Sequence, residues 1–260
     1  MNGVAVAQPV KLARDTWLTF QYEAGRWARN RAVIAASLLQ PATFLLFFTP
    51  FLKAVLHTRT YGDTFQIYVP LLLCSMGLFG GLFSGFALLA AIRQGVVGRL
   101  RVTPLSRVGL LLGRELTFVL MTGFQAVLIS AAGLVFGMRV RPANFVLALI
   151  VLAMMVLLGV SIAYGLALAV PNESVLPGLM TGLANPLSLL AGVLIPLSVA
   201  PVWVRDVALW NPFAWAANSM RALFQGHIGA PVVWEAFAIL AGLATVAVLL
   251  SSRIFSREIA

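Results

Sequence analysis

Residues 142–172 read PANFVLALIVLAMMVLLGVSIAYGLALAVPN, a stretch that contains no charged side chain. An α-helix rises about 1.5 Å per residue and the hydrocarbon core of a bilayer is about 30 Å thick, so about 20 apolar residues suffice for one crossing. The stretch therefore predicts a helix that spans a membrane.

Five further uncharged stretches share this apolar character. They cover residues 32–52, 64–92, 116–138, 174–204 and 236–252, and the last of them is slightly short for a full crossing. Hydrophobic residues make up 61% of the chain and charged residues 10%, a balance that would leave a soluble protein with more apolar surface than it could bury. We therefore expect an all-α integral membrane protein in which residues 32–260 form a domain of six transmembrane helices.

The basic residues indicate the orientation of these spans. The net charge is +10, and 12 of the 18 Lys and Arg residues fall in segments that share one side of the membrane if there are six crossings. Because basic residues concentrate on the cytoplasmic side, we expect both termini and the connection between the second and third spans to be cytoplasmic. The orientation of the spans thus accounts for the positive net charge, and we expect no nucleic-acid partner. The excess of arginine over lysine is typical of a GC-rich bacterial coding sequence, so we expect the plasma (inner) membrane of a bacterium.

Residues 1–31 form a cytoplasmic tail before the first span. Apolar residues recur there at spacings of three and four, which places them on one face of a helix: Val10, Ala13, Trp17, Phe20, Ala24 and Trp27. Arginines flank this face, and tryptophan and arginine both suit the headgroup layer of a membrane. We expect an amphipathic interfacial helix in contact with membrane lipid; a helix that binds a partner protein is the alternative.

The second stretch carries two rows of residues. Glycines recur at intervals of four, which lets another helix approach closely: Gly77, Gly81 and Gly85. Bulky rings form a row on another face, where they would contact a lipophilic substrate or belong to the core: Phe79, Phe83 and Phe86.

The fifth stretch carries one small and polar face. Its members are spaced by four and three residues: Ser174, Gly178, Thr181, Asn185, Ser188 and Gly192. A polar face avoids lipid, so Thr181, Asn185 and Ser188 line a transport path or hold helices together. Both interpretations stay open from the sequence.

Residues 200–226 are not polar enough for a free loop, and charged residues and prolines interrupt them too often for another span. The Asn211-Pro212 pair between tryptophans predicts a break between two short helices that dip into the outer leaflet. We expect an extracellular re-entrant hairpin before the sixth span, with an amphipathic stretch on the membrane surface as the alternative.

Residues 93–107 read RQGVVGRLRVTPLSR and lie on the cytoplasmic side by the charge pattern. Pro104 disfavours helical geometry at Thr103, so the segment predicts a short basic helix with a defined end. Such a protrusion is a plausible docking surface for a partner.

This run and the following Leu110-Leu111-Leu112-Gly113 resemble the coupling-helix region of ABC type 2 permeases, especially the daunorubicin-resistance permeases. Residues 192–197 and 201–226 resemble the extracellular hairpin region of that family. The candidate hairpin residues are Pro196, Trp203, Asn211, Pro212 and Arg221.

The resemblance implies a coupling helix at about residues 93–106 that docks on a cytoplasmic ABC ATPase. The candidate coupling residues are Arg93, Gly95, Arg99, Leu100, Arg101, Thr103 and Pro104. A transporter of this family would contain two ATPase copies and a second permease, either identical or paralogous. Family members commonly carry glutamate near the start of this region, where this chain has Gln94.

The chain lacks a nucleotide site of its own. A phosphate-binding loop needs a lysine after a glycine, and neither Lys11 nor Lys53 follows one. ATP and Mg²⁺ would therefore bind to the partner ATPase, and the chain would be a transporter subunit rather than an enzyme. His57, His227 and Cys74 lie in different segments, so they predict no metal site.

The acidic residues fall at or outside the ends of the apolar stretches, which disfavours ion coupling. Glu115 and Glu173 are the closest exceptions, and we expect both to lie at the membrane interface, with Glu115 paired locally with Arg114 or Arg107. The sequence thus predicts the permease subunit of an exporter that moves a drug, natural product or lipid outward. A polysaccharide or glycolipid exporter and an ion-coupled carrier or channel are the alternatives.

Overall fold

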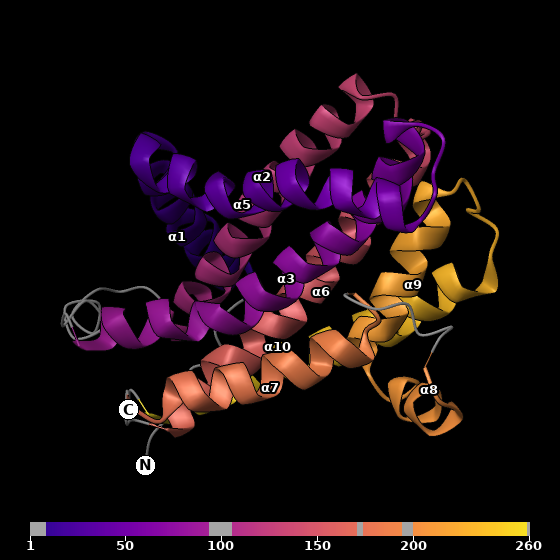
Figure 1. Cartoon of the computed structure of the whole chain (residues 1–260). Coiled ribbons are helices and arrows are strands. Elements are labelled where there is room, and N and C mark those ends of the chain that lie inside the picture. Colours follow the sequence, from indigo (N-terminus) through magenta and orange to yellow (C-terminus); the bar gives the residue numbers. More distant parts are fainter. Residues whose placement is uncertain (1–8, 94–105, 171–173, 194–199, 259–260) are drawn as a thin grey trace, which may run out of the picture.

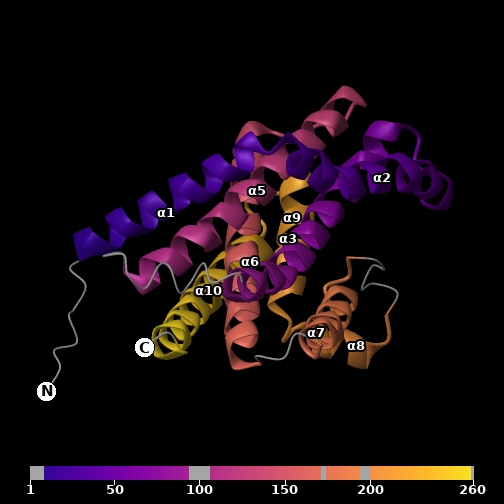
Figure 2. The ribbon, with the colours of Figure 1, turned by 90° about the vertical axis from the view of Figure 1, so that its left-hand side faces the viewer.

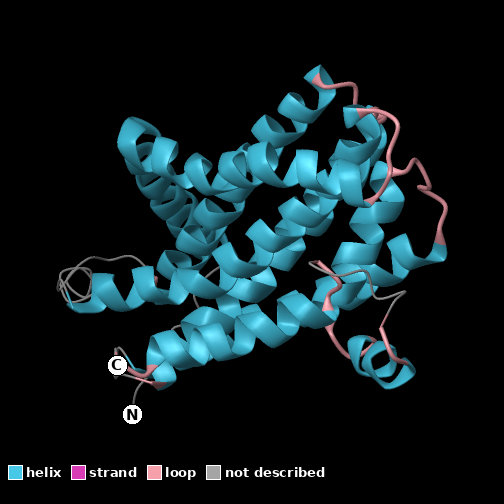
Figure 3. Ribbon diagram, in the orientation of Figure 1, coloured by secondary structure: helices cyan, strands magenta, loops and turns pink. Residues whose placement is uncertain are grey.

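The computed structural model describes residues 9–93, 106–170, 174–193 and 200–258. The regular structure within these ranges is helical (Figure 3). Figure 1 labels the helices α1 (Pro9–Arg29), α2 (Arg31–Val55), α3 (Tyr61–Arg93), α5 (Arg107–Val135), α6 (Pro142–Ala169), α7 (Leu176–Leu190), α8 (Val202–Ala208), α9 (Pro212–Phe224) and α10 (Pro231–Glu258).

Five of these helices are long and apolar enough to cross a membrane: α2, α3, α5, α6 and α10. They correspond to five of the six predicted spans. The predicted fifth span is represented by α7, which has 15 residues and reaches about 22 Å, less than the thickness of the hydrocarbon core. A six-span count therefore stays a prediction. The predicted start of the third span was wrong, because α5 begins at Arg107 and includes Glu115.

The most extensive contact among the described helices is the α3–α6 seam, where Gly81 and Gly85 of α3 lie against Gly159 and Ala163 of α6. A Cβ atom added to Gly81 would lie 3.2 Å from the Gly159 Cα atom, and one added to Gly85 would lie 2.9 Å from the Ala163 carbonyl oxygen. Only glycine lets two backbones approach this closely. The prediction that the glycine row of the second span packs against protein is confirmed.

Helix α1 runs along the first half of α5 (Figure 2). Its buried side is polar, because Asp15 and Thr19 are buried while Trp17 is 56% exposed. Of the predicted apolar face, Trp27 is buried and meets Phe124 of α5 edge-on. The helix was predicted correctly, and contact of its apolar face with lipid stays a prediction.

Helices α8 and α9 are separated by a break at residues 209–211, as the Asn211-Pro212 pair predicts. The side chain of Asn211 caps α9 by accepting a hydrogen bond from the Phe213 N–H at 3.0 Å. Helix α9 packs against α3, α6 and α10, and α8 lies beside α7 (Figures 1 and 2). Insertion of this pair into the outer leaflet stays a prediction.

Candidate functional site: the junction beside the coupling segment

The predicted coupling segment joins α3 to α5. Arg93 is its first residue, and it lies exposed at the end of α3. Six candidates lie outside the described residues: Gly95, Arg99, Leu100, Arg101, Thr103 and Pro104. Their role in coupling therefore stays a prediction. The structure describes the chain on either side of them.

Ser106 is the first described residue after the segment. Its hydroxyl oxygen accepts a hydrogen bond from the Gly109 N–H at 3.1 Å and so caps α5. Its own backbone N–H donates to the Asp15 carboxylate at 2.8 Å. Asp15 belongs to α1 and is 4% exposed, so a buried negative charge on α1 holds the backbone where the coupling segment ends.

Two glycines of α5 let α1 approach this point. A Cβ atom on Gly109 would lie 2.8 Å from the Asp15 Cβ atom, and one on Gly113 would lie 2.6 Å from the Thr19 Cβ atom. Because such contacts are too short for real side chains, α1 and α5 touch through their backbones at both glycines. Any larger residue at either position would push the two helices apart.

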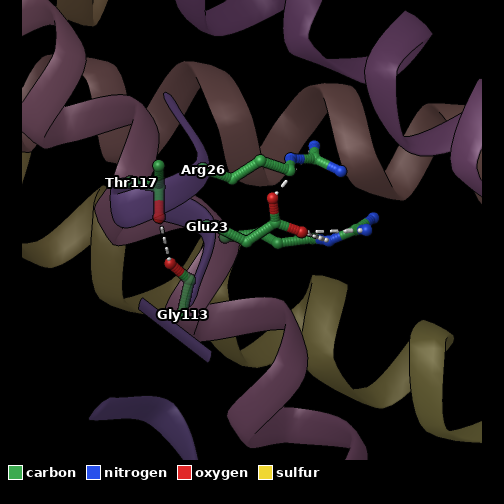
Figure 4. A network of polar contacts seen from close by, with 5 residues as sticks. Glu23, Arg26, Gly113 and Thr117 are labelled. Carbon is green, nitrogen blue, oxygen red and sulfur yellow. Dashed lines mark hydrogen bonds and ion pairs between the residues drawn. The ribbon is translucent and has the colours of Figure 1, made fainter. Parts of the chain in front are cut away.

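A second polar contact between α1 and α5 lies about two helical turns further along α1. Glu23 accepts a hydrogen bond from Arg114 Nε at 3.2 Å and forms an ion pair with Arg26 at 3.0 Å (Figure 4). The Arg114 side chain is 15% exposed and that of Glu23 is 11% exposed, so water screens this pair less than a surface ion pair. Next to it, the Thr117 hydroxyl donates to the Gly113 carbonyl oxygen at 2.9 Å.

We call this set the α1–α5 junction: Asp15, Glu23, Ser106, Gly109, Gly113 and Arg114. Asp15 and Glu23 received no role from the sequence alone, and their acidic side chains on a mostly basic tail were the one available signal. The junction joins Ser106 and the first turns of α5 to α1.

Glu115, next to the junction, contradicts its predicted pairing. Its neighbour Arg114 pairs with Glu23 instead, and the Glu115 side chain is fully buried. One carboxylate oxygen accepts a hydrogen bond from the Ser161 hydroxyl of α6 at 3.0 Å, and Ser251 of α10 also lies beside it. An acidic group therefore lies inside the bundle, within a helix long enough to span the membrane.

The predicted aromatic row on α3 is continuous. Phe79 and Phe83 have ring centroids 5.8 Å apart, as do Phe83 and Phe86. All three rings are half-buried and pack against the core. The three residues thus form one ladder, although their place in a transport path stays a prediction.

The predicted polar face on α7 is divided. Ser188 is buried and donates to the Asn185 carbonyl oxygen at 2.9 Å. Thr181 and Asn185 are exposed, whereas the stripe of α7 that faces the bundle consists of Leu176, Met180, Ala184 and Ser188. Helix α7 therefore turns Leu176, Met180 and Ala184 inward, and its outward side carries Thr181 and Asn185 beside exposed leucines.

The hairpin candidates hold the end of α7. The Asn211 amide donates to the Leu187 carbonyl oxygen at 2.8 Å, and the Arg221 guanidinium donates to the Gly192 carbonyl oxygen. Pro212 is the first residue of α9, and Trp203 is 68% exposed on α8. Pro196 lies outside the described residues.

Residues 14–224 match the ABC-2 type transporter family. This range contains the junction, the coupling segment, the aromatic row and α7. The chain belongs to the ABC-2 type transporter family. Within the described ranges of this ABC-2 protein, no group of three or more His, Cys, Asp or Glu side chains could hold a metal ion.

Two kinds of relatives are similar to this ABC-2 protein. The "Putative transport permease ycf38" of Cyanophora paradoxa is 24% identical over 201 residues, which cover 76% of this chain and 69% of the relative. The "Daunorubicin resistance ABC transporter permease protein DrrB1" of Streptomyces coeruleorubidus is 24% identical over 228 residues, which cover 85% and 78%. The resemblance to ABC type 2 permeases is confirmed. The protein is a multi-pass transport permease, and its family implies association with an ABC ATPase subunit.

Proposed function

We propose that the chain is the membrane permease of an ABC exporter that moves an amphipathic or lipophilic compound outward across a bacterial plasma membrane. A separate cytoplasmic ATPase would dock on residues 93–106. The observation that carries this proposal is the bond between the Asp15 carboxylate and the Ser106 backbone. It ties the end of the docking segment to α1 and α5, so closure of the ATPases would tilt both helices as a rigid unit.

The exposed polar side of α7 supports a paired transporter. Thr181 and Asn185 would face hydrocarbon in a single copy, where unpaired polar groups are costly. A second permease, identical or paralogous, would cover this side and enclose a path between the two copies. Two permeases would then work with two ATPase subunits, with ATP and Mg²⁺ bound on the latter.

The proposed cargo follows from the chemistry of these side chains. Half-buried rings on α3 and small polar groups on α7 carry no fixed charge, which suits a drug, a natural product or a lipid. The name of the Streptomyces relative, which refers to daunorubicin resistance, points in the same direction. Sugars also stack on aromatic rings, so the Phe79–Phe83–Phe86 ladder keeps a polysaccharide or glycolipid as the alternative cargo.

The test starts with purification of the chain from its native host and identification of the ATPase that accompanies it. Inside-out vesicles that contain both subunits should accumulate a lipophilic dye or daunorubicin when ATP is added. Vesicles with an ATPase that cannot hydrolyse ATP are the control. Transport that persists without the ATPase, or that follows an ion gradient, would contradict the proposal.

An ion-coupled carrier is the second candidate, because Glu115 places a carboxyl group inside the bundle. Under the exporter proposal, Glu115→Gln keeps a polar partner for Ser161, so ATP-driven transport should persist. Under the carrier hypothesis the same variant should abolish transport driven by a proton gradient in vesicles without the ATPase.

A further inference from the structure

A basic pocket opens at the opposite end of the bundle from the coupling segment. It lies where α5 ends, α6 begins and α9 turns toward α10, and its volume is about 620 Å³. Two arginines, Arg139 and Arg141, line it together with His227, and its apolar lining consists of Leu134, Val140 and Phe224. The proposed transport cycle uses none of these residues.

Two side-chain amides, from the half-buried Gln66 and the buried Asn144, hold the walls of this pocket in place. The Gln66 side chain of α3 donates to the Arg139 carbonyl oxygen at 2.9 Å and accepts from the Arg139 N–H at 3.0 Å. It also donates to the Phe224 carbonyl oxygen at the end of α9. Asn144 of α6, 3% exposed, donates to the Leu223 carbonyl oxygen at 2.8 Å. The backbone on two sides of the pocket is therefore fixed before any ligand arrives.

The two arginine side chains stay available. Only the backbone of Arg139 takes part in the contacts to Gln66, and neither Arg139 nor Arg141 forms an ion pair within the described part of the chain. Asp63 is the acid that attracts Arg139, and its carboxylate is itself bound by the Thr60 N–H and hydroxyl at 3.0 and 2.8 Å. Two guanidinium groups on a fixed backbone suit an oxyanion, which they bind with paired hydrogen bonds.

We propose that the basic pocket binds a phosphate group through Arg139 and Arg141, with the apolar part of its carrier against Leu134, Val140 and Phe224. The pocket lies at the ends of α5 and α6, which are long and apolar enough to span a membrane, and lipid headgroups surround the ends of such helices. A phospholipid headgroup and a phosphate compound from solution are the two possible sources. The site does not depend on the proposed direction of transport.

The experiment measures binding to the purified full-length protein in an uncharged detergent. Fluorescent phosphatidylglycerol is titrated into the wild type, into Arg139→Gln/Arg141→Gln and into Arg59→Gln/Arg205→Gln. The second pair removes two exposed arginines that do not line the pocket, so both variants lose the same charge. We expect at least about a tenfold loss of affinity in the pocket variant and less than about a twofold loss in the control.

Competition with inorganic phosphate separates the two sources. Displacement of the lipid by phosphate supports a site that takes phosphate from solution, and failure of displacement supports a lipid site. Equal losses in both variants would show that the lipid senses only net charge, which overturns the proposal. Absence of binding to the wild type, or unchanged affinity in the pocket variant, would overturn it as well.

Discussion

The α3–α6 seam and helix α7 differ in how completely the chain covers them. At the seam, glycines bring two backbones into contact and the surrounding side chains are buried. On α7 only one stripe is buried, while Thr181 and Asn185 lie exposed on the other side. Under the proposed function, a second permease would cover the exposed side of α7, whereas the α3–α6 seam is closed within the chain itself.

Of the variants considered, Gly81→Leu should destabilise the α3–α6 seam most. Its side chain would meet the α6 backbone, because a Cβ atom there already lies 3.2 Å from Gly159 Cα. Overpacking of this kind costs about 3 kcal/mol or more where only backbone can yield. We expect loss of monodisperse protein on size exclusion and a lower thermal unfolding temperature in detergent.

Gly80→Leu is the matched control for this variant. A Cβ atom at Gly80 would meet nothing within 4 Å, so the same side chain one residue earlier should leave stability unchanged. Equal damage from both variants would show that leucine disturbs α3 itself rather than the seam.

The two sides of α7 should respond in opposite ways. Met180→Ala removes a fully buried side chain and should lower the free energy of unfolding by about 2 kcal/mol or more. Asn185→Leu changes an exposed residue, so stability should change by less than about 0.5 kcal/mol, while transport of the lipophilic dye should fall. Thermal unfolding measures the stability of each variant, and dye uptake by vesicles from the same preparations measures its transport. Normal transport by Asn185→Leu would remove this residue from the path.

The α1–α5 junction lies next to the segment on which the ATPase is proposed to dock. Asp15→Ala leaves the Ser106 N–H without its acceptor, and a hydrogen bond to a charged group contributes about 1.5–3 kcal/mol. We expect ATP-driven transport to fall about tenfold while ATP hydrolysis by the complex continues. Asp206→Ala, which removes an exposed acid of α8, is the control and should transport normally. Unchanged transport by Asp15→Ala would separate the junction from coupling.

The smallest effect is a difference in labelling that leaves the protein intact. Cys74 of α3 has no exposed surface, so a water-soluble maleimide should not modify it until the protein is unfolded in dodecyl sulfate. In a Cys74→Ser background, Thr181→Cys places a thiol on the exposed side of α7 and should react or cross-link two copies. A fast reaction at Cys74 in the folded protein would show that the core near the seam opens.

Most of the helices could be predicted from the sequence, because uncharged apolar stretches of span length have few alternatives. The glycine row could be predicted as well, because residues spaced by four lie on one face of a helix whatever packs against that face. The start of α5 could not be predicted, because two adjacent charged residues, Arg114 and Glu115, suggest that the membrane span begins after them. In the structure Arg114 is neutralised by Glu23 from α1, so the helix continues past both charges.

The candidate site was predicted only in part. Composition and spacing predict a basic protrusion at residues 93–107, most of which lies outside the described residues. They also predict a polar face at residues 174–192, which α7 divides between its buried and exposed sides. The contact between Asp15 and Ser106 joins residues that lie 91 positions apart, and no periodicity in one sequence reveals such a pair. The burial of Asp15 and Thr19 on α1 is hidden for the same reason. It depends on Gly109 and Gly113 of α5, which let these side chains approach at short range.

The central claim is that a cytoplasmic ATPase drives the permease through residues 93–106. The most direct measurement places a single cysteine at Arg99 in the Cys74→Ser background, within the complex purified from its host. The account predicts cross-linking of this cysteine to the ATPase subunit, which nucleotide changes, and no labelling by an impermeant maleimide added to intact cells. Labelling from outside, or absence of a cross-link at Arg99 and at Gly95 and Arg101 tested in the same way, would contradict it.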